Sequence, residues 1–276
     1  SAPHQIKTTQ TTILTDSVFT TGIEGPAMDS FGNLFVVNYQ KEGTIGHVNP
    51  VTGNVNTLVE LPNNSIGNGI RFNKKDEFLI ADYVNHNILK IEPNTKNISI
   101  YAHHDSLNQP NDVAIMSNGI LFASDPKWSN STGNLWRVDV NGTFVLLEKD
   151  MGTTNGVEVN PDNNLLYVNE SVQRKVWAYD LNQKGKISNK HLFFEFEDGG
   201  MDGMRCDEKG NLYIARYDKG EIAVISPQGL LIQLVKLHGQ KPTNITFSNK
   251  GKKCFVTLQD KKWVETFNAD FEGRKE

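Results

Sequence analysis

Six stretches of the chain repeat one order of polar and apolar positions. Each begins with a polar residue and a small or turn-forming residue, and continues with an alternating run, a turn and a second apolar run. Alternation with a period of two predicts half-buried β-strands, and Gly, Asp and Asn between the runs supply the positive φ of tight hairpins. The stretches therefore predict six β-hairpins, which start at Glu24, Asn68, Asn111, Asn155, Asp202 and Thr243.

The spacing of these hairpins is regular. Their first residues are separated by 44, 43, 44, 47 and 41 residues, which matches the roughly 40–45 residues of a four-stranded propeller blade. A third strand is expected in five repeats, within 44–50, 87–93, 134–140, 175–181 and 221–227, and a fourth apolar run follows four of these. The sequence thus predicts an all-β, six-bladed β-propeller with four antiparallel strands per blade, which occupies residues 1–276 as one domain.

The last repeat predicts how the ring closes. It offers Cys254–Leu258 and Trp263–Asn268 as its second and third strands, but no fourth. We expect the N-terminal segment Thr11–Phe19 to supply that outer strand and so tie the last blade to the first.

Composition narrows the class of protein. Hydrophobic residues make up 37% and charged residues 22%, as is usual in globular proteins. The net charge of −4 argues against a nucleic-acid partner, and no apolar run approaches the roughly 18 residues of a membrane span. We expect a soluble protein, cytoplasmic or else periplasmic or secreted after signal removal, and a monomer or weak homo-oligomer. Cys206 and Cys254 fall at apolar strand positions and are expected to be two buried free thiols.

The first residue of each repeat carries a side-chain oxygen. Because the blades are related by a rotation about the channel axis, these six residues must face one another. Asn and Asp favour strand entrances for local reasons, but Glu24 is a poor turn former, and two carboxylates in a narrow channel repel without a counter-ion. A bound divalent cation resolves this repulsion. Carboxylate and amide oxygens without His or Cys favour calcium, with magnesium or manganese next, over zinc.

Several motifs resemble those of the SMP-30/gluconolactonase family over about residues 15–268. They are Glu24-Gly25-Pro26, Pro110-Asn111-Asp112, Thr154-Asn155-Gly156 and Met201-Asp202-Gly203, supported by 174–181, 203–217 and 242–247. The resemblance implies a six-bladed propeller with one catalytic divalent cation in its channel. Members of the family include lactonases, and phosphotriesterase-like and paraoxonase-type propellers are related.

The resemblance also implies roles for individual residues. Glu24, Asn155 and Asp202 match the metal ligands, and Asn111 matches a residue that ligates the metal or contacts the substrate. Asp202 also resembles the general base. The metal set expected is therefore Glu24, Asn111, Asn155 and Asp202, holding Ca²⁺ or, in its place, Mg²⁺, Mn²⁺ or Zn²⁺, with Asn68 and Thr243 as bystanders.

Substrate contacts are expected from the loops around the same end of the channel. An arginine that grips sugar hydroxyls in sugar-lactone members is replaced here by Gln109, so a polyhydroxylated substrate does not follow from the resemblance. The residues expected to bind substrate are Gln109, Asn111, Asp125, Glu170, Arg216 and Tyr217. Trp128 is a further candidate for the pocket wall, whereas His103 and His104 are expected to be surface residues rather than a proton shuttle.

These features predict a metal-dependent lactonase, a carboxylic ester hydrolase that acts on a small lactone or ester. The metal would polarise the carbonyl while Asp202 removes a proton from water. Two alternatives stay open: a phosphotriesterase- or arylesterase-like hydrolase at the same metal, and a non-catalytic propeller that binds a ligand.

Overall fold

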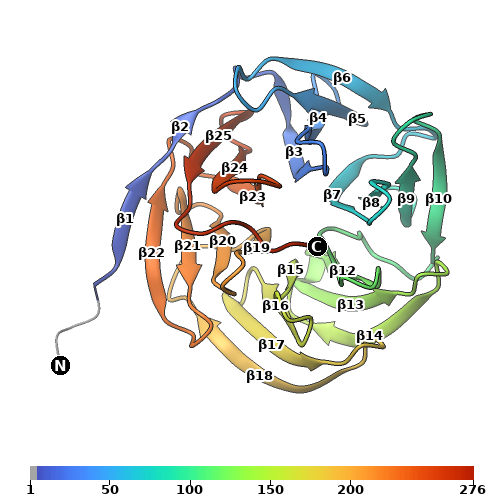
Figure 1. Cartoon of the computed structure of the whole chain (residues 1–276). Coiled ribbons are helices and arrows are strands. Elements are labelled where there is room, and N and C mark those ends of the chain that lie inside the picture. The colour runs from blue at the N-terminus through green and yellow to red at the C-terminus, as the bar shows by residue number, and fades with distance from the viewer. Residues whose placement is uncertain (1–4) are drawn as a thin grey trace.

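Six sheets, five with four strands and one with five, stand around a central channel in the computed structural model, which describes residues 5–276 (Figure 1). The predicted six-bladed, all-β propeller is confirmed. Apart from the N-terminal segment, the first strand of each blade in sequence order lies innermost, and the following strands pair antiparallel toward the rim.

The first three blades are continuous in sequence, and their strands are ordered from the channel outward. Blade one is β3 (Phe19–Met28), β4 (Leu34–Tyr39), β5 (Thr44–Val48) and β6 (Val55–Glu60). Blade two is β7 (Gly67–Phe72), β8 (Phe78–Asp82), β9 (Asn87–Ile91) and β10 (Ile98–His103). Blade three is β11 (Val113–Ile115), β12 (Leu121–Lys127), β13 (Thr132–Val138) and β14 (Phe144–Met151), with the 3₁₀ turn η1 (Trp128–Asn130) between β12 and β13.

The remaining blades follow the same order, except that the N-terminal segment adds to two of them. Blade four is β15 (Thr154–Val159), β16 (Leu165–Glu170), β17 (Lys175–Leu181) and β18 (Ile187–Glu195). Blade five is β19 (Met204–Cys206), β20 (Leu212–Arg216), β21 (Glu221–Ile225), β22 (Leu231–Lys236) and, at its rim, β1 (Lys7–Gln10). Blade six is β23 (Pro242–Phe247), β24 (Lys253–Leu258), β25 (Trp263–Asn268) and β2 (Thr12–Ile13).

The N-terminal segment closes the ring, but with a shorter strand than predicted. Only Thr12–Ile13 pairs with β25, antiparallel, and the backbone N–H of Leu14 extends the contact to Val264. Phe19 already belongs to β3 of blade one, so the predicted strand Thr11–Phe19 is too long. The parallel pairing of β1 with β22 was not expected, because a polar strand at the rim leaves no alternating apolar pattern.

Apolar side chains fill the spaces between neighbouring blades. Among the described residues, one buried hydrophobic cluster lies between each pair of adjacent blades. The cluster that joins blades six and one combines Val264 and Phe255 with Phe19, Ile23 and Leu34. Both cysteines are buried and free, as predicted. The six inner strands are thereby held at fixed positions around the channel.

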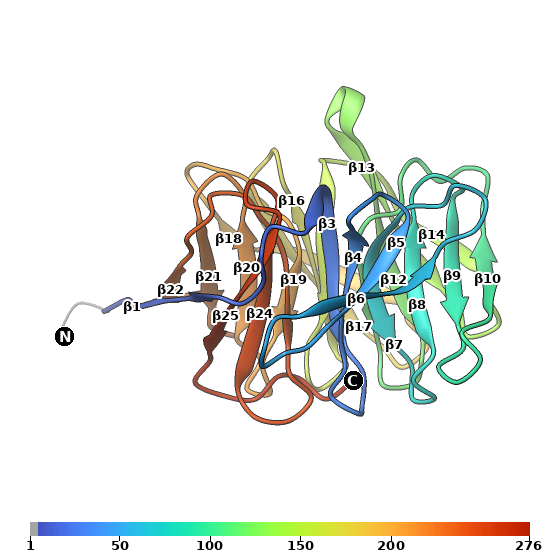
Figure 2. The ribbon, with the colours of Figure 1, turned by 90° about the horizontal axis from the view of Figure 1, so that it is seen from above.

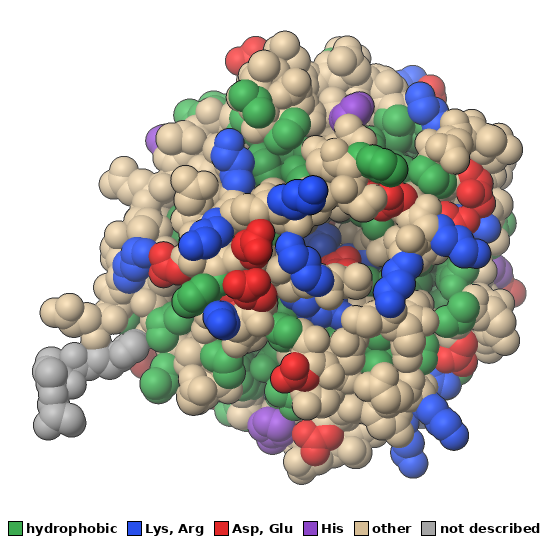
Figure 3. Space-filling view, viewed as in Figure 1, with side chains coloured by type: hydrophobic (Ala, Val, Ile, Leu, Met, Phe, Trp, Pro, Cys, Tyr) green, Lys and Arg blue, Asp and Glu red, His purple; other side chains and the backbone are tan. Residues whose placement is uncertain are grey.

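The two faces of the ring differ. The C-terminal residues cross one face and end over the channel in Figure 1, where acidic and basic side chains mix around a central hollow (Figure 3). On the opposite face the turn between β12 and β13 projects beyond its neighbours (Figure 2). Where the structure describes the chain, no helix has the length and apolarity to span a bilayer.

Candidate active site

The first residues of the six repeats meet at the channel end that lies under the projecting turn. Four of the inner strands break register at this level, at Glu24/Ala27, Gly67/Ile70, Thr154/Val157 and Pro242/Asn244. Such bulges redirect side chains. Backbone bonds from Gly69 to Asn111 and from Gly203 to Thr243, both 2.9 Å, tie neighbouring inner strands at the same height.

Glycines below this ring let the strands approach one another. The next residue in four repeats is Gly25, Gly69, Gly156 or Gly203. A Cβ on Gly203 would overlap the Asn244 amide, and one on Gly69 would lie 2.8 Å from Asp112 Oδ1. Gly25 also has φ +59°, a conformation that glycine adopts without strain. The narrow channel therefore depends on these glycines.

Three amide oxygens of the ring are buried without a hydrogen-bond donor. They are the Oδ1 atoms of Asn68, Asn111 and Asn155. A buried acceptor without a partner is costly in free energy. Three such oxygens on one ring fit a bound cation that contacts them in place of hydrogen-bond donors. Amide oxygens are ligands that calcium uses in proteins.

Two carboxyls complete the ring. Burial first, and then the charge of Asp112, raises the pKa of Glu24 to about 8. Burial and the charge of Glu24 likewise raise the pKa of Asp202 well above its ordinary value. Glu24 Oε2 accepts bonds from the Gly25 N–H at 2.6 Å and from Asn244 Nδ2 at 3.0 Å. A divalent cation would favour the ionised form of both groups.

The ring therefore fits a hard cation through mixed ligands. The described residues contain no cluster of three or more His, Cys, Asp or Glu side chains suited to a metal, and the candidate set is two carboxyls and three amides. Thr243 is not part of it, because its hydroxyl donates to the Ile23 carbonyl at 2.8 Å. Asn68, which we expected to be a bystander, has the same unpartnered oxygen as Asn111 and Asn155 and joins the set.

Asp112 and Asn244 form a second layer that sequence reasoning missed. They occupy the positions where the other four repeats have glycine. Asn244 Nδ2 donates to Glu24 and, at 3.2 Å, to Asp112 Oδ1, while Asp112 Oδ2 accepts the Val157 N–H. Comparing the residue after each ring position in all six repeats would have identified both.

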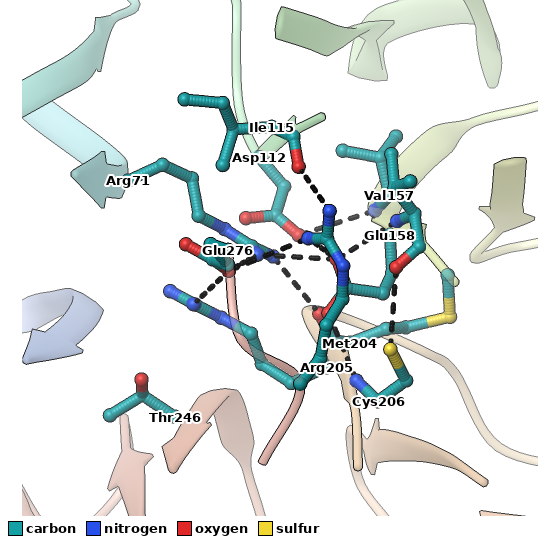
Figure 4. A network of polar contacts seen from close by, with 12 residues as sticks. Arg71, Asp112, Ile115, Val157, Glu158, Met204, Arg205, Cys206, Thr246 and Glu276 are labelled. Carbon is teal, nitrogen blue, oxygen red and sulfur yellow. Dashed lines mark hydrogen bonds and ion pairs between the residues drawn. The ribbon is translucent and has the colours of Figure 1, made fainter. Parts of the chain in front are cut away.

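An ion-pair network closes the far end of the channel (Figure 4). The fully buried Arg71 contacts Glu158 at 3.2 Å and also pairs with Glu276. Arg205 bonds Glu276 at 3.0 Å, and Arg274 donates to the Ile115 carbonyl at 2.8 Å. Although burial opposes it, Arg71 and Arg205 hold the pKa of Glu276 below its ordinary value. The ring of oxygens is therefore reached from the opposite face.

Two adjoining cavities open on that face. The smaller, about 240 Å³, is lined by Glu24, Asn68, Gln109, Asn111 and Asp202, among others. The larger, about 510 Å³, is lined by Asn155, Asp202 and Tyr217 with several apolar neighbours. Trp128, Asp202 and Gln259 line both, so the two cavities meet over Asp202.

The expected substrate-binding residues fall into two groups. Gln109, Asn111 and Tyr217 line the cavities, and Trp128 forms part of the wall. Asp125 and Glu170 do not, because their carboxyls are bound behind the loops. Asp125 accepts the Asn108 and Gln109 N–H groups at 2.8 and 2.7 Å, whereas Glu170 accepts the Gly152 N–H and, at 2.7 Å, Trp177 Nε1.

Arg216 is also turned away from the cavities. Its guanidinium donates to the carbonyls of Asp198 and Gly200 and lies 3.6 Å from the Phe196 ring centre. Asp125, Glu170 and Arg216 thus hold the loops beside the cavities, and their contact with a substrate stays a prediction. Their position at the ends of strands correctly placed these residues at the cavity end of the channel. It did not predict the direction in which each side chain points.

Of the two loop histidines, His103 lies at the surface as expected, whereas His104 is half-buried. His103 is exposed and bonds Asn87 and Asp105, each at 2.7 Å. His104 packs against Trp136 with ring centres 4.9 Å apart. Neither histidine lines the two cavities.

Comparison with known proteins agrees with this fold. The profile of the SMP-30/gluconolactonase/LRE-like region matches residues 22–259. The chain belongs to this family. The structure is similar to that of a calcium-binding regucalcin from Agrobacterium tumefaciens, with a TM-score of 0.84 at 19% identity over 99% of this chain and 98% of that one.

Curated relatives of this family member include two kinds of hydrolase. It is 26% identical to a gluconolactonase from Zymomonas mobilis over 69% of this chain and 60% of the relative. It is 24% identical to the diisopropyl-fluorophosphatase of Loligo vulgaris over 92% of this chain and 91% of the relative. The match thus spans less than two thirds of the Zymomonas protein. A pentonolactonase from Haloferax volcanii is a further lactonase among the relatives.

Proposed function

We propose that this chain is a divalent-cation-dependent hydrolase that opens the ring of a lactone. The observation that carries the proposal is the ring itself, in which three buried amide oxygens without donors stand beside two buried carboxyls. A channel used only as a scaffold gains nothing from this costly arrangement. Calcium suits these ligands best, since all five are hard oxygen donors.

Glu24, Asn111, Asn155 and Asp202, with Asn68, would hold the cation. When bound, it would polarise the lactone carbonyl and stabilise negative charge on that oxygen. The chain's own residues supply position and proton transfer. Asn111 and Gln109 border the cavity above the ring and offer amide groups to orient the ester.

Asp202 is the proposed general base. It lies where the two cavities meet, and its backbone is fixed by a bond from its N–H to the Ala215 carbonyl at 2.9 Å. Ionised Asp202 takes a proton from water as the water oxygen bonds to the carbonyl carbon. The ring C–O bond then breaks, the proton passes to the leaving alkoxide oxygen, and a hydroxy acid is released.

A lactone panel on wild type, Glu24→Gln and Asp202→Asn tests the proposal. Both variants should lose at least about 10³-fold in kcat/KM, because each removes a ligand and Asp202→Asn also removes the base. Glu60→Gln, at an exposed surface ion pair, is the matched control and should keep full activity. Wild-type rates in Glu24→Gln and Asp202→Asn would refute the proposal.

A second candidate function is phosphotriester hydrolysis at the same ring. The similarity to the Loligo enzyme, which spans nearly the whole of both chains, favours it. The same variants tested on an uncharged fluorophosphate separate the two functions. Activity on the phosphorus ester alone would replace the lactonase proposal, and calcium binding without activity on either ester would favour a binding protein.

A further inference from the structure

The larger cavity is lined by apolar side chains beside Asn155 and Asp202 of the ring of oxygens. Val172 is 53% exposed and Trp128 is 46% exposed, although both are large apolar side chains. Met201 forms the buried floor. Apolar groups gathered at one cavity mark a binding surface more often than isolated exposed residues do.

Tyr217 contributes its ring rather than its hydroxyl to this wall. The hydroxyl donates to Gln259 Oε1, and Gln259 Nε2 in turn donates to the Thr21 carbonyl at 3.0 Å. The polar end of Tyr217 is therefore already paired, and its ring lines the cavity. We refer to Trp128, Val172, Met201 and Tyr217 as the apolar wall.

The projecting turn is anchored where it carries Trp128 over the cavity. Strands β12 and β13 stay paired up to Lys127 and Thr132, and Gln173 Nε2 donates to the Ser131 carbonyl at 3.0 Å. That bond links the turn to the loop after β16, which also carries Val172. Trp128 and Val172 are thus held on connected segments.

Charge restricts the ligand further. Of the described residues, none of those lining the two cavities is Lys, Arg or His, whereas Glu24, Asp202 and Asp218 are acidic. A phosphorylated, sulfonated or carboxylated substrate would meet no cationic side chain among these lining residues, and would meet several like charges. Gln109 offers the smaller cavity an uncharged amide, and Arg216 is turned away from both cavities. The cavity suits an uncharged ligand with an apolar part.

We propose that the preferred substrates are uncharged lactones with an apolar substituent, which lies along the apolar wall while the ester lies over the ring of oxygens. This inference rests on the proposed function, since the two cavities join at Asp202. Burial of a methylene there should raise kcat/KM by about fourfold.

The first test is a series of δ-lactones, from unsubstituted δ-valerolactone to 5-alkyl derivatives with one to five carbons, with gluconolactone for comparison. We expect kcat/KM to rise over at least the first three carbons, to roughly 50-fold above the unsubstituted lactone, and gluconolactone to rank lowest. A flat series, or gluconolactone as the best substrate, would overturn the inference and leave the proposed function standing.

Variants of the apolar wall test whether it causes the rise of kcat/KM with alkyl chain length. Val172→Ser should lower the ratio of kcat/KM between the longest and the unsubstituted lactone by about fivefold, and Trp128→Ala should lower it further. Val140→Ser, at a valine that is 59% exposed outside the cavities, is the control and should keep the wild-type ratio. A ratio compares two substrates of one protein, so partial loss of folded protein does not change it.

Binding of the matching δ-valerolactams, with the same alkyl groups on the ring carbon next to nitrogen, separates this inference from the proposed function. These lactams resist hydrolysis, and calorimetry reads their affinity without turnover. Affinity that rises with chain length in wild type but not in Trp128→Ala supports the wall even in a protein that opens no lactone. Affinity independent of chain length would overturn it.

Discussion

Glu24 and Asp202 lie at the same end of the channel. Their ionisation makes the stability of the fold depend on pH and on cation binding. Burial raises the pKa of Glu24 to about 8 from an ordinary 4.5, and Asp202 shifts in the same direction. At a pH between the ordinary pKa of Glu24 and its raised pKa, the folded chain binds more protons than the unfolded chain. The free energy of unfolding must then fall as pH rises, by up to about 1.4 kcal/mol per pH unit for each group.

Thermal unfolding from pH 5 to pH 8 measures this coupling. In chelator-treated protein we expect Tm to fall with rising pH over this range, and in calcium-loaded protein we expect the fall to be removed, because the cation favours the ionised carboxylates. The difference between the two curves should widen with pH. Parallel curves would contradict the predicted coupling, and Glu24→Gln should flatten the metal-free slope.

Gln109 tests the substrate preference at a single position. Gln109→Arg introduces the cation that both cavities lack, and should raise the kcat/KM of gluconolactone relative to δ-valerolactone by roughly tenfold. The ratio of the two substrates in steady-state assays is the measurement. Gln183→Arg, an exposed position in the turn between β17 and β18, is the control. An unchanged ratio in Gln109→Arg would show that the residue at this position does not affect the choice between the two lactones.

At the residue scale, the sequence predicted the ring well and the side-chain directions poorly. The six first positions could be found because a repeat with rotational symmetry must bring equivalent residues together. Asp125 and Arg216 could not be assigned in the same way, since a strand-end residue turns either toward the cavity or into its own loop. That choice depends on which backbone N–H and C=O groups remain unpaired, which sequence spacing does not reveal.

At the scale of the strands, the glycines under the ring decide how closely the blades approach. Gly203→Ala would push its Cβ into the Asn244 amide, which holds Glu24. We expect a loss of about 2 kcal/mol in the free energy of unfolding from this overpacking, together with weaker calcium binding.

Urea unfolding with and without calcium measures both effects. The control is Gly200→Ala, whose Cβ would meet nothing closer than 3.5 Å and should change stability by less than about 0.5 kcal/mol. Equal stability of the two variants would show that the inner strands adjust more freely than the contacts indicate.

Strands with one buried face could be predicted from the alternation of apolar and polar residues. Strands that are exposed on both faces could not. The predicted third strands at 175–181 and 221–227 are β17 and the main part of β21. The outer strand β18 escaped detection, because most of its residues are exposed and show no alternation. For the same reason β1 could not be anticipated.

For the whole molecule, closure depends on the N-terminal segment. Removal of residues 1–10 deletes only β1 from the rim of blade five, whereas removal of residues 1–15 also deletes β2, the fourth strand of blade six. We expect the first truncation to lower Tm slightly and the second to lower it much more, because it exposes the edge of β25 next to the closing cluster. Calorimetry on both truncations gives the comparison, and equal Tm values would contradict closure through β2.

A chelator titration tests whether the ring of oxygens holds a cation that lactone opening requires. Wild-type protein is stripped with EDTA and dialysed, and hydrolysis of δ-valerolactone is then followed by pH-stat while Ca²⁺ is added. We predict that activity disappears on stripping and returns in full as one equivalent of Ca²⁺ binds. Full hydrolysis by stripped protein would show that the reaction needs no cation at the ring of oxygens.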